Sequence, residues 1–216
     1  MKRNLSLDQL HEEVPENYYD NAIKKNLLQR FWHTSRFVQA KKYLETVDAR
    51  QILDVGCNSG TFTKQVYNVF PESRIYGIDI SQKAISYAKQ KYKNISFNVA
   101  WAEKLPFKNK SFDLITCFEV LEHVDNPEKI IKEMSRVLKK RGNMIIIVPT
   151  ENLLFRIIWA FWTIFGPGSV WKHTHVQKFT RNNLDVLLRK SGCRIVKKNT
   201  FLLGMLLITH ARNTQK

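Results

Sequence analysis

Between residues 51 and 148 the chain alternates short apolar runs with longer amphipathic segments, and this pattern constrains the fold more than any other feature. Five runs have the length of single strands and lie at 52–55, 74–80, 95–99, 112–118 and 143–148. The apolar spacing between them predicts helices over 61–69, 82–91 and 127–139. Strands this continuously apolar leave no face for water, so we expect a mostly parallel sheet with helices on both sides.

The regions on either side of this alternation complete a single domain over 1–216. Apolar residues three and four positions apart predict a helical layer within 21–47. Near the C-terminus we expect a helix over 180–190 and strands over 194–199 and 201–208. The expected divisions are an N-terminal helical cap (1–48), an alternating core (50–149), an insertion (151–179) and a C-terminal helix with a hairpin (180–216).

Basic residues outnumber acidic ones by 35 to 19, which gives a formal net charge of +16. The excess is concentrated in 151–216, where eleven basic residues face two acidic ones. Such a charge attracts a nucleic acid, an anionic membrane or a phosphorylated substrate. Three widely spaced cysteines, Cys57, Cys117 and Cys193, exclude a disulfide framework and a zinc finger. The N-terminal stretch has no apolar signal sequence, so we expect a cytoplasmic protein.

A turn with two glycines, Gly56 and Gly60, follows the first predicted strand and precedes a predicted helix. Glycines let a ligand approach the backbone closely, and the start of a helix offers free amide donors. The dinucleotide-binding fingerprint G-x-G-x-x-G does not fit, because Asn58 stands where it requires glycine. The second predicted strand leads to Asp79, an acid that could accept both hydroxyls of a ribose.

The glycine turn is the first of five sequence blocks that follow one another along the chain. The other four are 78–81 (Ile-Asp-Ile-Ser), 102–107 (Ala-Glu-Lys-Leu-Pro-Phe), 111–114 (Ser-Phe-Asp-Leu) and 119–124 (Glu-Val-Leu-Glu-His-Val). In this order they resemble a class I S-adenosylmethionine-dependent methyltransferase of the type 11 or ubiquinone-pathway kind. The resemblance implies a doubly wound, seven-stranded, mostly parallel Rossmann-like sheet. Its final antiparallel hairpin suits 193–209.

The resemblance also implies the cofactor S-adenosylmethionine (SAM), with S-adenosylhomocysteine (SAH) as product, bound by the core over 50–149. In that family the glycine turn contacts the methionine part of SAM, the acid matching Asp79 binds the ribose hydroxyls, and Ile80 packs on adenine. Asp54 orients the turn and the amino group of the ligand in one interpretation, and only caps a loop in the other. The implied cofactor-binding residues are Asp54, Gly56, Cys57, Asn58, Gly60, Asp79, Ile80, Ala102, Glu103 and Phe118.

Two positions depart from the family pattern. Asn58 stands where glycine is common, although asparagine can adopt the left-handed backbone conformation. Trp101 stands where the family often has an acid that accepts the adenine amino group. Since an indole cannot accept that hydrogen bond, either another group takes it or Trp101 packs beside the base.

A group of acids and a histidine follows the fourth predicted strand. His123 is the candidate catalytic base, because an alcohol acceptor must lose a proton during methyl transfer. Glu119-x-x-Glu122-His123 also resembles a metal-binding turn of ubiquinone-pathway O-methyltransferases and small-RNA 2′-O-methyltransferases. In the RNA group a later histidine completes the site, and His173 or His175 could take that place. The candidate ligands of a divalent metal are therefore Glu119, Glu122, His123 and His175. Alternatively, the two glutamates only orient the turn and His123 lines the acceptor pocket.

The segment 153–165 is apolar except at Arg156 and Thr163, and its 13 residues are too few to span a bilayer. It could close over an apolar acceptor, place its aromatic residues at the headgroup level of a membrane, or pack against the N-terminal layer. These aromatic residues are Trp159, Phe161, Trp162 and Phe165. In that layer, Tyr18, Tyr19 and Arg36 could cover the pocket, with Arg36 pairing with the SAM carboxylate, or could serve packing alone.

The leading hypothesis is an enzyme that uses SAM to methylate an oxygen or nitrogen of a small apolar acceptor, lipid-like or quinone-like. We expect it in the cytoplasm, peripherally bound to the anionic inner face of the membrane. The net charge and the 119–123 turn make an RNA 2′-O-methyltransferase the second choice of function and nucleic acid the second choice of partner. A third hypothesis is a non-catalytic protein that binds the cofactor or a partner. The sequence specifies no oligomeric state.

Overall fold

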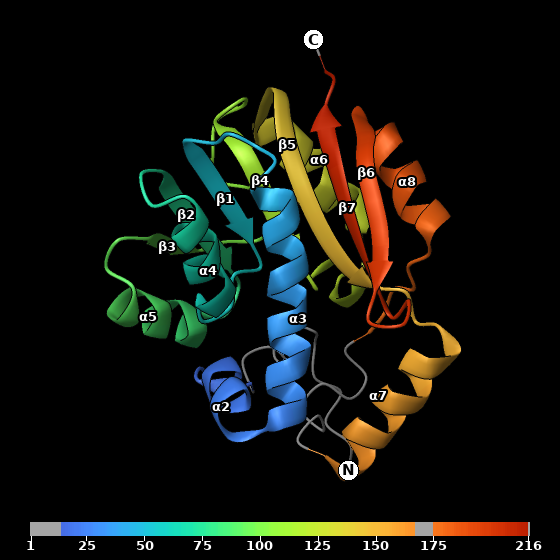
Figure 1. Ribbon diagram of the computed structural model, residues 1–216. Helices are drawn as coiled ribbons and strands as arrows, with labels where there is room; N and C mark the ends of the chain where they lie inside the picture. Colours follow the sequence, from blue (N-terminus) through green and yellow to red (C-terminus); the bar gives the residue numbers. More distant parts are fainter. Residues whose placement is uncertain (1–13, 167–174, 216) are drawn as a thin grey trace.

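The computed structural model describes residues 14–166 and 175–215, in which seven strands form one sheet with helices on both faces (Figure 1). The strand order is β3-β2-β1-β4-β5-β7-β6, and β7 is antiparallel to both of its neighbours. The predicted doubly wound, mostly parallel, seven-stranded sheet is confirmed. Its strands are β1 (Gln51–Val55), β2 (Arg74–Asp79), β3 (Ser96–Val99), β4 (Phe112–Phe118), β5 (Leu138–Pro149), β6 (Cys193–Phe201) and β7 (Leu206–Asn213).

The helices form two layers around this sheet. On one face α3, α4 and α5 bury residues such as Leu44, Val66 and Ile85. On the other face α6 and α8 bury Ile131 and Leu188. In Figure 1, α3 and α4 stand in front of the sheet and α6 lies behind it. The helices are α2 (Tyr18–Lys25), α3 (Leu27–Leu44), α4 (Thr61–Val69), α5 (Gln82–Lys91), the short 3-10 helix η1 (Leu121–His123), α6 (Pro127–Val137), α7 (Leu153–Phe165) and α8 (Arg181–Lys190).

The order of the strands reverses at β1, which positions the candidate site. β1 pairs in parallel with both β2 and β4, although β2 and β4 follow it on opposite sides of the sheet. The connections to these two neighbours leave the sheet in opposite directions, which opens a crevice beyond the carboxyl ends of the strands. The glycine turn, the end of β2 and the segment after β4 all lie at this crevice.

The predicted start of the last strand, in 201–208, is wrong. β7 begins only at Leu206. The turn before it holds Leu202, Leu203 and Gly204 at positive φ angles of 50°, 55° and 79°. Apolar periodicity could not reveal this turn, because leucines there are as apolar as the strands on either side and only the glycine is a usual turn residue.

Two other boundaries differ from the prediction. β5 begins at Leu138 rather than at Asn143, because Leu138 already pairs with Phe112 and a bulge follows in the pairing. The preceding helix, α6, accordingly ends before the predicted residue 139. The N-terminal layer consists of two helices, since the chain is extended at Asn26, between α2 and α3.

Asn26 determines where α3 starts. Its Oδ1 accepts hydrogen bonds from the backbone amides of Leu28 and Gln29, at 3.0 and 3.1 Å. Replacing such an N-cap by alanine leaves these amides without a side-chain partner. We therefore expect Asn26→Ala to lower the free energy of unfolding by about 1 kcal/mol, measured by urea denaturation. Asn68→Ala, in an exposed part of α4, is the control and should cause no loss. Equal losses in the two variants would contradict the role of Asn26.

Candidate functional site

A cavity of about 270 Å³ lies beyond the carboxyl ends of β1, β2 and β4. The candidate base His123, which is 9% exposed, is one of the residues that line this cavity. Gly60 is the one cofactor-binding candidate outside this lining; at φ 76° it is the residue from which α4 starts. The candidates that line the cavity are Asp54, Gly56, Cys57, Asn58, Asp79, Ile80, Ala102, Glu103 and Phe118.

The glycine turn is a tight bend whose backbone packs against its neighbours. Gly56 has φ 72°, and a Cβ there would lie 2.2 Å from Cγ2 of Val120. Asn58 adopts the left-handed conformation expected of it, with φ 47°. The amides of Gly56 and Cys57 both donate to the carbonyl of Ile78 at 2.9 Å. These two amides are therefore engaged within the fold, and at these two positions the turn offers a ligand space and no donors.

Asp79 is held in a fixed orientation at the end of β2. Its Oδ2 accepts a hydrogen bond from the amide of Asn58 at 2.9 Å, and its Oδ1 accepts one from the amide of Ser81 at 3.0 Å. The turn after β1 and the start of α5 thus position one carboxylate. Trp101 lies nearby on the cavity lining and is 52% exposed.

Asp54 is buried among three elements, and its oxygens face hydroxyl groups. Thr63 of α4 donates to one oxygen at 2.6 Å, and Thr116 of β4 donates to the other at 2.7 Å. Burial raises the pKa of Asp54 to about 6, against the lowering effect of both hydrogen bonds. Neither threonine lies in a loop, so these contacts link β1 to α4 and β4 and do not cap a loop.

The N-terminal helices form one side of the cavity through Tyr19 and Arg36. Arg36 is 4% exposed, makes an ion pair with Glu119 and lies 4.6 Å from the ring centre of Phe62. Its guanidinium also bonds to Nδ1 of His33, which accepts because burial and the charge of Arg36 lower the pKa of His33 to about 2. Arg36 therefore already has an anionic partner, Glu119, in the place where the sequence suggested the SAM carboxylate.

Asp20 holds α2 beside the cavity, a role that no sequence pattern indicated. One of its oxygens accepts a hydrogen bond from Thr61 at 3.3 Å, and the other accepts one from Tyr87 at 2.7 Å and pairs with Lys91. These partners lie on α4 and α5, so Asp20 connects the cap to the helices beside the cofactor candidates. Because the partners are 41 to 71 positions away, local patterns could not identify them.

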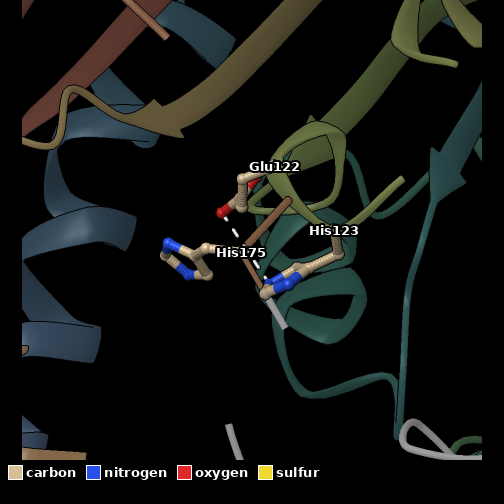
Figure 2. Close-up of side chains that lie close together, drawn as sticks. All are labelled: Glu122, His123 and His175. Atoms are coloured by element: carbon tan, nitrogen blue, oxygen red, sulfur yellow. Dashed lines mark ion pairs between the residues drawn. The ribbon is translucent and has the colours of Figure 1, made fainter. Parts of the chain in front are cut away.

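Three of the four candidate metal ligands lie together. Glu122, His123 and His175 have ligand atoms within 4.8 Å of one another, and Figure 2 shows the three side chains side by side. Oε1 of Glu122 is 3.9 Å from Nε2 of His123. The other oxygen of Glu122 is buried and has no partner among the described residues, and burial raises the pKa of this carboxyl to about 8. Glu119 lies apart from the cluster in its pair with Arg36. His173 lies outside the described residues.

Two neighbours position His175, namely the segment around Glu122 and the helix α7. The amides of Val176 and Gln177 donate to the carbonyl of Glu122 at 2.9 and 3.0 Å, which places the histidine beside η1. Trp159 of α7 lies against the imidazole, with ring centres 4.2 Å apart. Burial lowers the pKa of His175, although Glu151, 3.2 Å away, opposes this shift.

The inner face of α7 confirms one of the three hypotheses for this segment, packing against the N-terminal layer. Phe155 is 4% exposed, and its ring centre lies 6.2 Å from that of Trp32 on α3 and 5.9 Å from that of His175. α7 therefore packs against the N-terminal layer and covers the histidine of the cluster. No helix in the described ranges has both the length and the apolarity needed to cross a membrane.

A family model described as a methyltransferase domain matches residues 46–191, more than half of the chain. The chain belongs to this methyltransferase family. The matched range contains the whole cavity lining contributed by β1, β2 and β4. The class I resemblance is confirmed, and with it SAM as the cofactor of the family.

Two relatives of this methyltransferase domain have names that refer to quinones. A demethylmenaquinone methyltransferase of Chlorobaculum parvum is 28% identical over 149 residues, which cover 68% of this chain and 61% of that protein. A ubiquinone biosynthesis O-methyltransferase of Coxiella burnetii is 28% identical over 165 residues, which cover 72% of this chain and 69% of that protein. The methyltransferase domain thus spans less than two thirds of the Chlorobaculum protein.

Solved structures share the fold of the methyltransferase domain. A Pyrococcus horikoshii protein superposes with a TM-score of 0.72 at 19% identity, covering 91% of this chain and 98% of that one. The magnesium protoporphyrin IX methyltransferase of Synechocystis, solved with bound SAH, gives a TM-score of 0.68 at 18% identity. That superposition covers 88% of this chain and 89% of the Synechocystis protein.

The buried carboxyl of Asp54 predicts a measurable pH dependence of stability. Its pKa is about 6 in the folded state and 3.8 as the ordinary value. The stability contributed by the neutral carboxyl is fully present below pH 3.8 and is lost as the pH rises through 6. Asn does not titrate, so between about pH 4 and pH 7 the free energy of unfolding of Asp54→Asn should gain about 2 kcal/mol relative to the parent.

Urea denaturation at several pH values measures this difference. Asp48→Asn, at an exposed position before β1, is the control and should run parallel to the parent protein. A constant offset between Asp54→Asn and the parent across this range would show that Asp54 titrates normally in the fold.

Proposed function

We propose that this methyltransferase domain transfers the methyl group of SAM to an oxygen or nitrogen of a small apolar acceptor. The observation that carries the proposal is the cavity itself. It joins nine cofactor-binding candidates to His123, and the cluster behind His123 is covered by the apolar helix α7. The lipid-like or quinone-like character of the acceptor is supported by the aromatic face of α7 and by the names of the two relatives.

The proposed cofactor site uses the geometry after β1 and β2. Asp79 accepts the ribose hydroxyls, Ile80 packs on adenine, and the bend at Gly56 leaves room for the methionine part. Glu103, Ala102 and Phe118 complete the lining. Trp101 packs beside the base, because the exposed indole next to Ala102 has an open face and no acceptor atom.

The proposed reaction is an in-line displacement at the methyl carbon. The bond between the sulfonium sulfur and the methyl group breaks, a bond from the acceptor oxygen or nitrogen to that carbon forms, and SAH leaves as a neutral sulfide. The protein must align the two molecules and exclude water, and Tyr19, Phe62 and Phe118 give the cavity the apolar sides that this requires. The proton of the acceptor passes to Nε2 or Nδ1 of His123, which lines the same cavity.

Glu122, His123 and His175 fit a divalent metal ion as an alternative use of the same cluster. The buried oxygen of Glu122 without a partner and the two imidazoles are suitable donors for such an ion. A bound ion would supply positive charge that lowers the pKa of an acceptor hydroxyl. His123 would then be a ligand and not the base, and activity would be lost with a chelator.

An RNA acceptor is the rival proposal. It is supported by the net charge of +16 and by the same cluster, because 2′-O-methylation also requires a hydroxyl to lose its proton. Binding of RNA that falls steeply with salt, together with methyl incorporation into RNA, would support this rival over the small acceptor.

Binding of SAM to variants of Asp79 tests the cofactor site. Asp79→Asn keeps an acceptor for the amide of Asn58 or Ser81 but loses the charge that strengthens hydrogen bonds to a diol. We expect SAM affinity, measured by calorimetry, to fall by about 2 kcal/mol, on the order of thirtyfold. Asp48→Asn, before β1 at the opposite end of the strand, should bind like the parent.

Binding and methylation assays on the parent protein distinguish an enzyme from a non-catalytic partner protein. If it binds neither SAM nor SAH, the enzyme proposal fails and the non-catalytic partner protein remains. If it binds SAM and methylates a lipid or quinone fraction but not RNA, the acceptor class is supported as well. The same assays with a chelator distinguish the two roles of His123. Activity should be lost if His123 is a metal ligand and kept if it is the base.

A further inference from the structure

Exposed large apolar side chains are concentrated at one end of the molecule. Among the described residues seventeen such side chains are exposed, and twelve of them lie on α3, on α7 or in the turn between β6 and β7. Scattered exposed apolar residues are ordinary, but a concentration of this kind marks an interaction surface. We call these twelve the docking face: Leu27, Leu28, Phe31, Val38, Leu153, Leu154, Ile157, Ile158, Phe161, Ile164, Phe165 and Leu203.

α7 supplies most of the docking face because it is apolar on its outer side as well as its inner side. Phe161 and Phe165 are 67% and 75% exposed, whereas Phe155 and Thr163 on the inner side are buried. The inner side also holds Trp159 and Trp162, which are half-buried. Of the four aromatic residues that the sequence offered to a membrane, the two phenylalanines are therefore the exposed ones.

The three parts of the docking face are connected. Asn152, which caps α7, donates a hydrogen bond to the carbonyl of Leu203 at 3.2 Å, so the start of α7 adjoins the exposed turn. A shallow groove lined by Leu27, Phe31 and Leu202 continues from that turn to α3. In Figure 1, α7 and the first half of α3 lie at the end of the molecule toward which β1 and β4 point, which is also the end with the cavity.

The charge around the docking face favours an anionic partner. Neither α3 nor α7 contains an aspartate or a glutamate. Exposed basic residues lie beside the apolar ones, namely Lys24 and Lys25 at the end of α2, Arg30 on α3 and Arg156 on α7. An apolar helix with basic neighbours and no acid is the composition that inserts at an anionic lipid interface.

We propose that the docking face binds the surface of an anionic lipid bilayer, with α7 and the start of α3 inserted among the headgroups. α7 has 13 residues, which is too short to cross, so it lies in the plane of the interface. Its inner side covers His175, and the same helix therefore separates the lipid from the candidate site. Resting on the proposed function, this orientation gives an apolar acceptor dissolved in the membrane a short path to the cavity.

Co-sedimentation with vesicles of phosphatidylcholine, with and without phosphatidylglycerol, tests the docking face. Phe161→Asp combined with Phe165→Asp removes two outward side chains and adds two negative charges. We expect affinity for the phosphatidylglycerol vesicles to fall on the order of a hundredfold. The matched control is Val186→Asp combined with Val196→Asp, on α8 and β6, where the exposures are 50% and 42%. This control adds the same charge away from the docking face, and its affinity for the same vesicles should fall by no more than about tenfold.

A second pair of substitutions tests the charge. Lys24→Gln combined with Lys25→Gln should lower affinity for the anionic vesicles about thirtyfold and make binding less sensitive to salt. Both lysines are exposed, so the fold should not change.

Several outcomes would overturn the proposal. These are equal binding by the Phe161/Phe165 variant and its control, equal binding of the parent to vesicles with and without phosphatidylglycerol, or a stable dimer in sedimentation that the Phe161/Phe165 variant abolishes. The last result would assign the docking face to a second copy of the chain. Calorimetry with SAM on the same variants keeps this test separate from the proposed function, since vesicle binding needs no cofactor and the variants leave the cavity lining intact.

Discussion

The bend after β1 is the constraint on which the candidate site depends. The carbonyl of Ile78 accepts hydrogen bonds from two successive amides of the bend, and Asp79 accepts the next one, from Asn58. This arrangement needs left-handed backbone at Gly56 and Asn58, and Val120 fills the space beside Gly56. The bend therefore joins the ends of β1 and β2 to the segment after β4, and the cavity is the space that these three segments enclose.

Sequence patterns predicted the parts of the fold that depend on neighbours in the chain. The alternating core and the left-handed Asn58 follow from local periodicity and from residue type. Contacts between distant residues were beyond such patterns, as with Arg36 and Glu119, 83 positions apart. The outward face of α7 was equally hidden, because a helix that is apolar all round gives no periodicity from which to infer a buried side.

Charge inside the cavity differs in sign from charge on the protein as a whole. Burial keeps Tyr19, which lines the cavity, neutral, with a pKa of about 12, and keeps His33, the neighbour of Arg36, neutral, with a pKa of about 2. Arg36 pairs with Glu119, so that pair contributes little net charge. Asp54 and Asp79 then leave the lining acidic, while the chain carries +16. The acidic lining of the cavity therefore favours a cationic sulfonium, while the net positive charge of the whole protein attracts anions to its surface.

Because of this separation of charge, the two sides of α7 must meet opposite chemical requirements. Its outer side needs apolar residues and basic neighbours to stay with anionic lipid, and its inner side must keep water and anionic headgroups away from Glu122 and His175. Phe155 and Trp159 meet the second requirement by stacking on the imidazole of His175. Glu122 lies beside His175 in the cluster, and burial raises the pKa of its carboxyl to about 8, so it holds a proton at neutral pH.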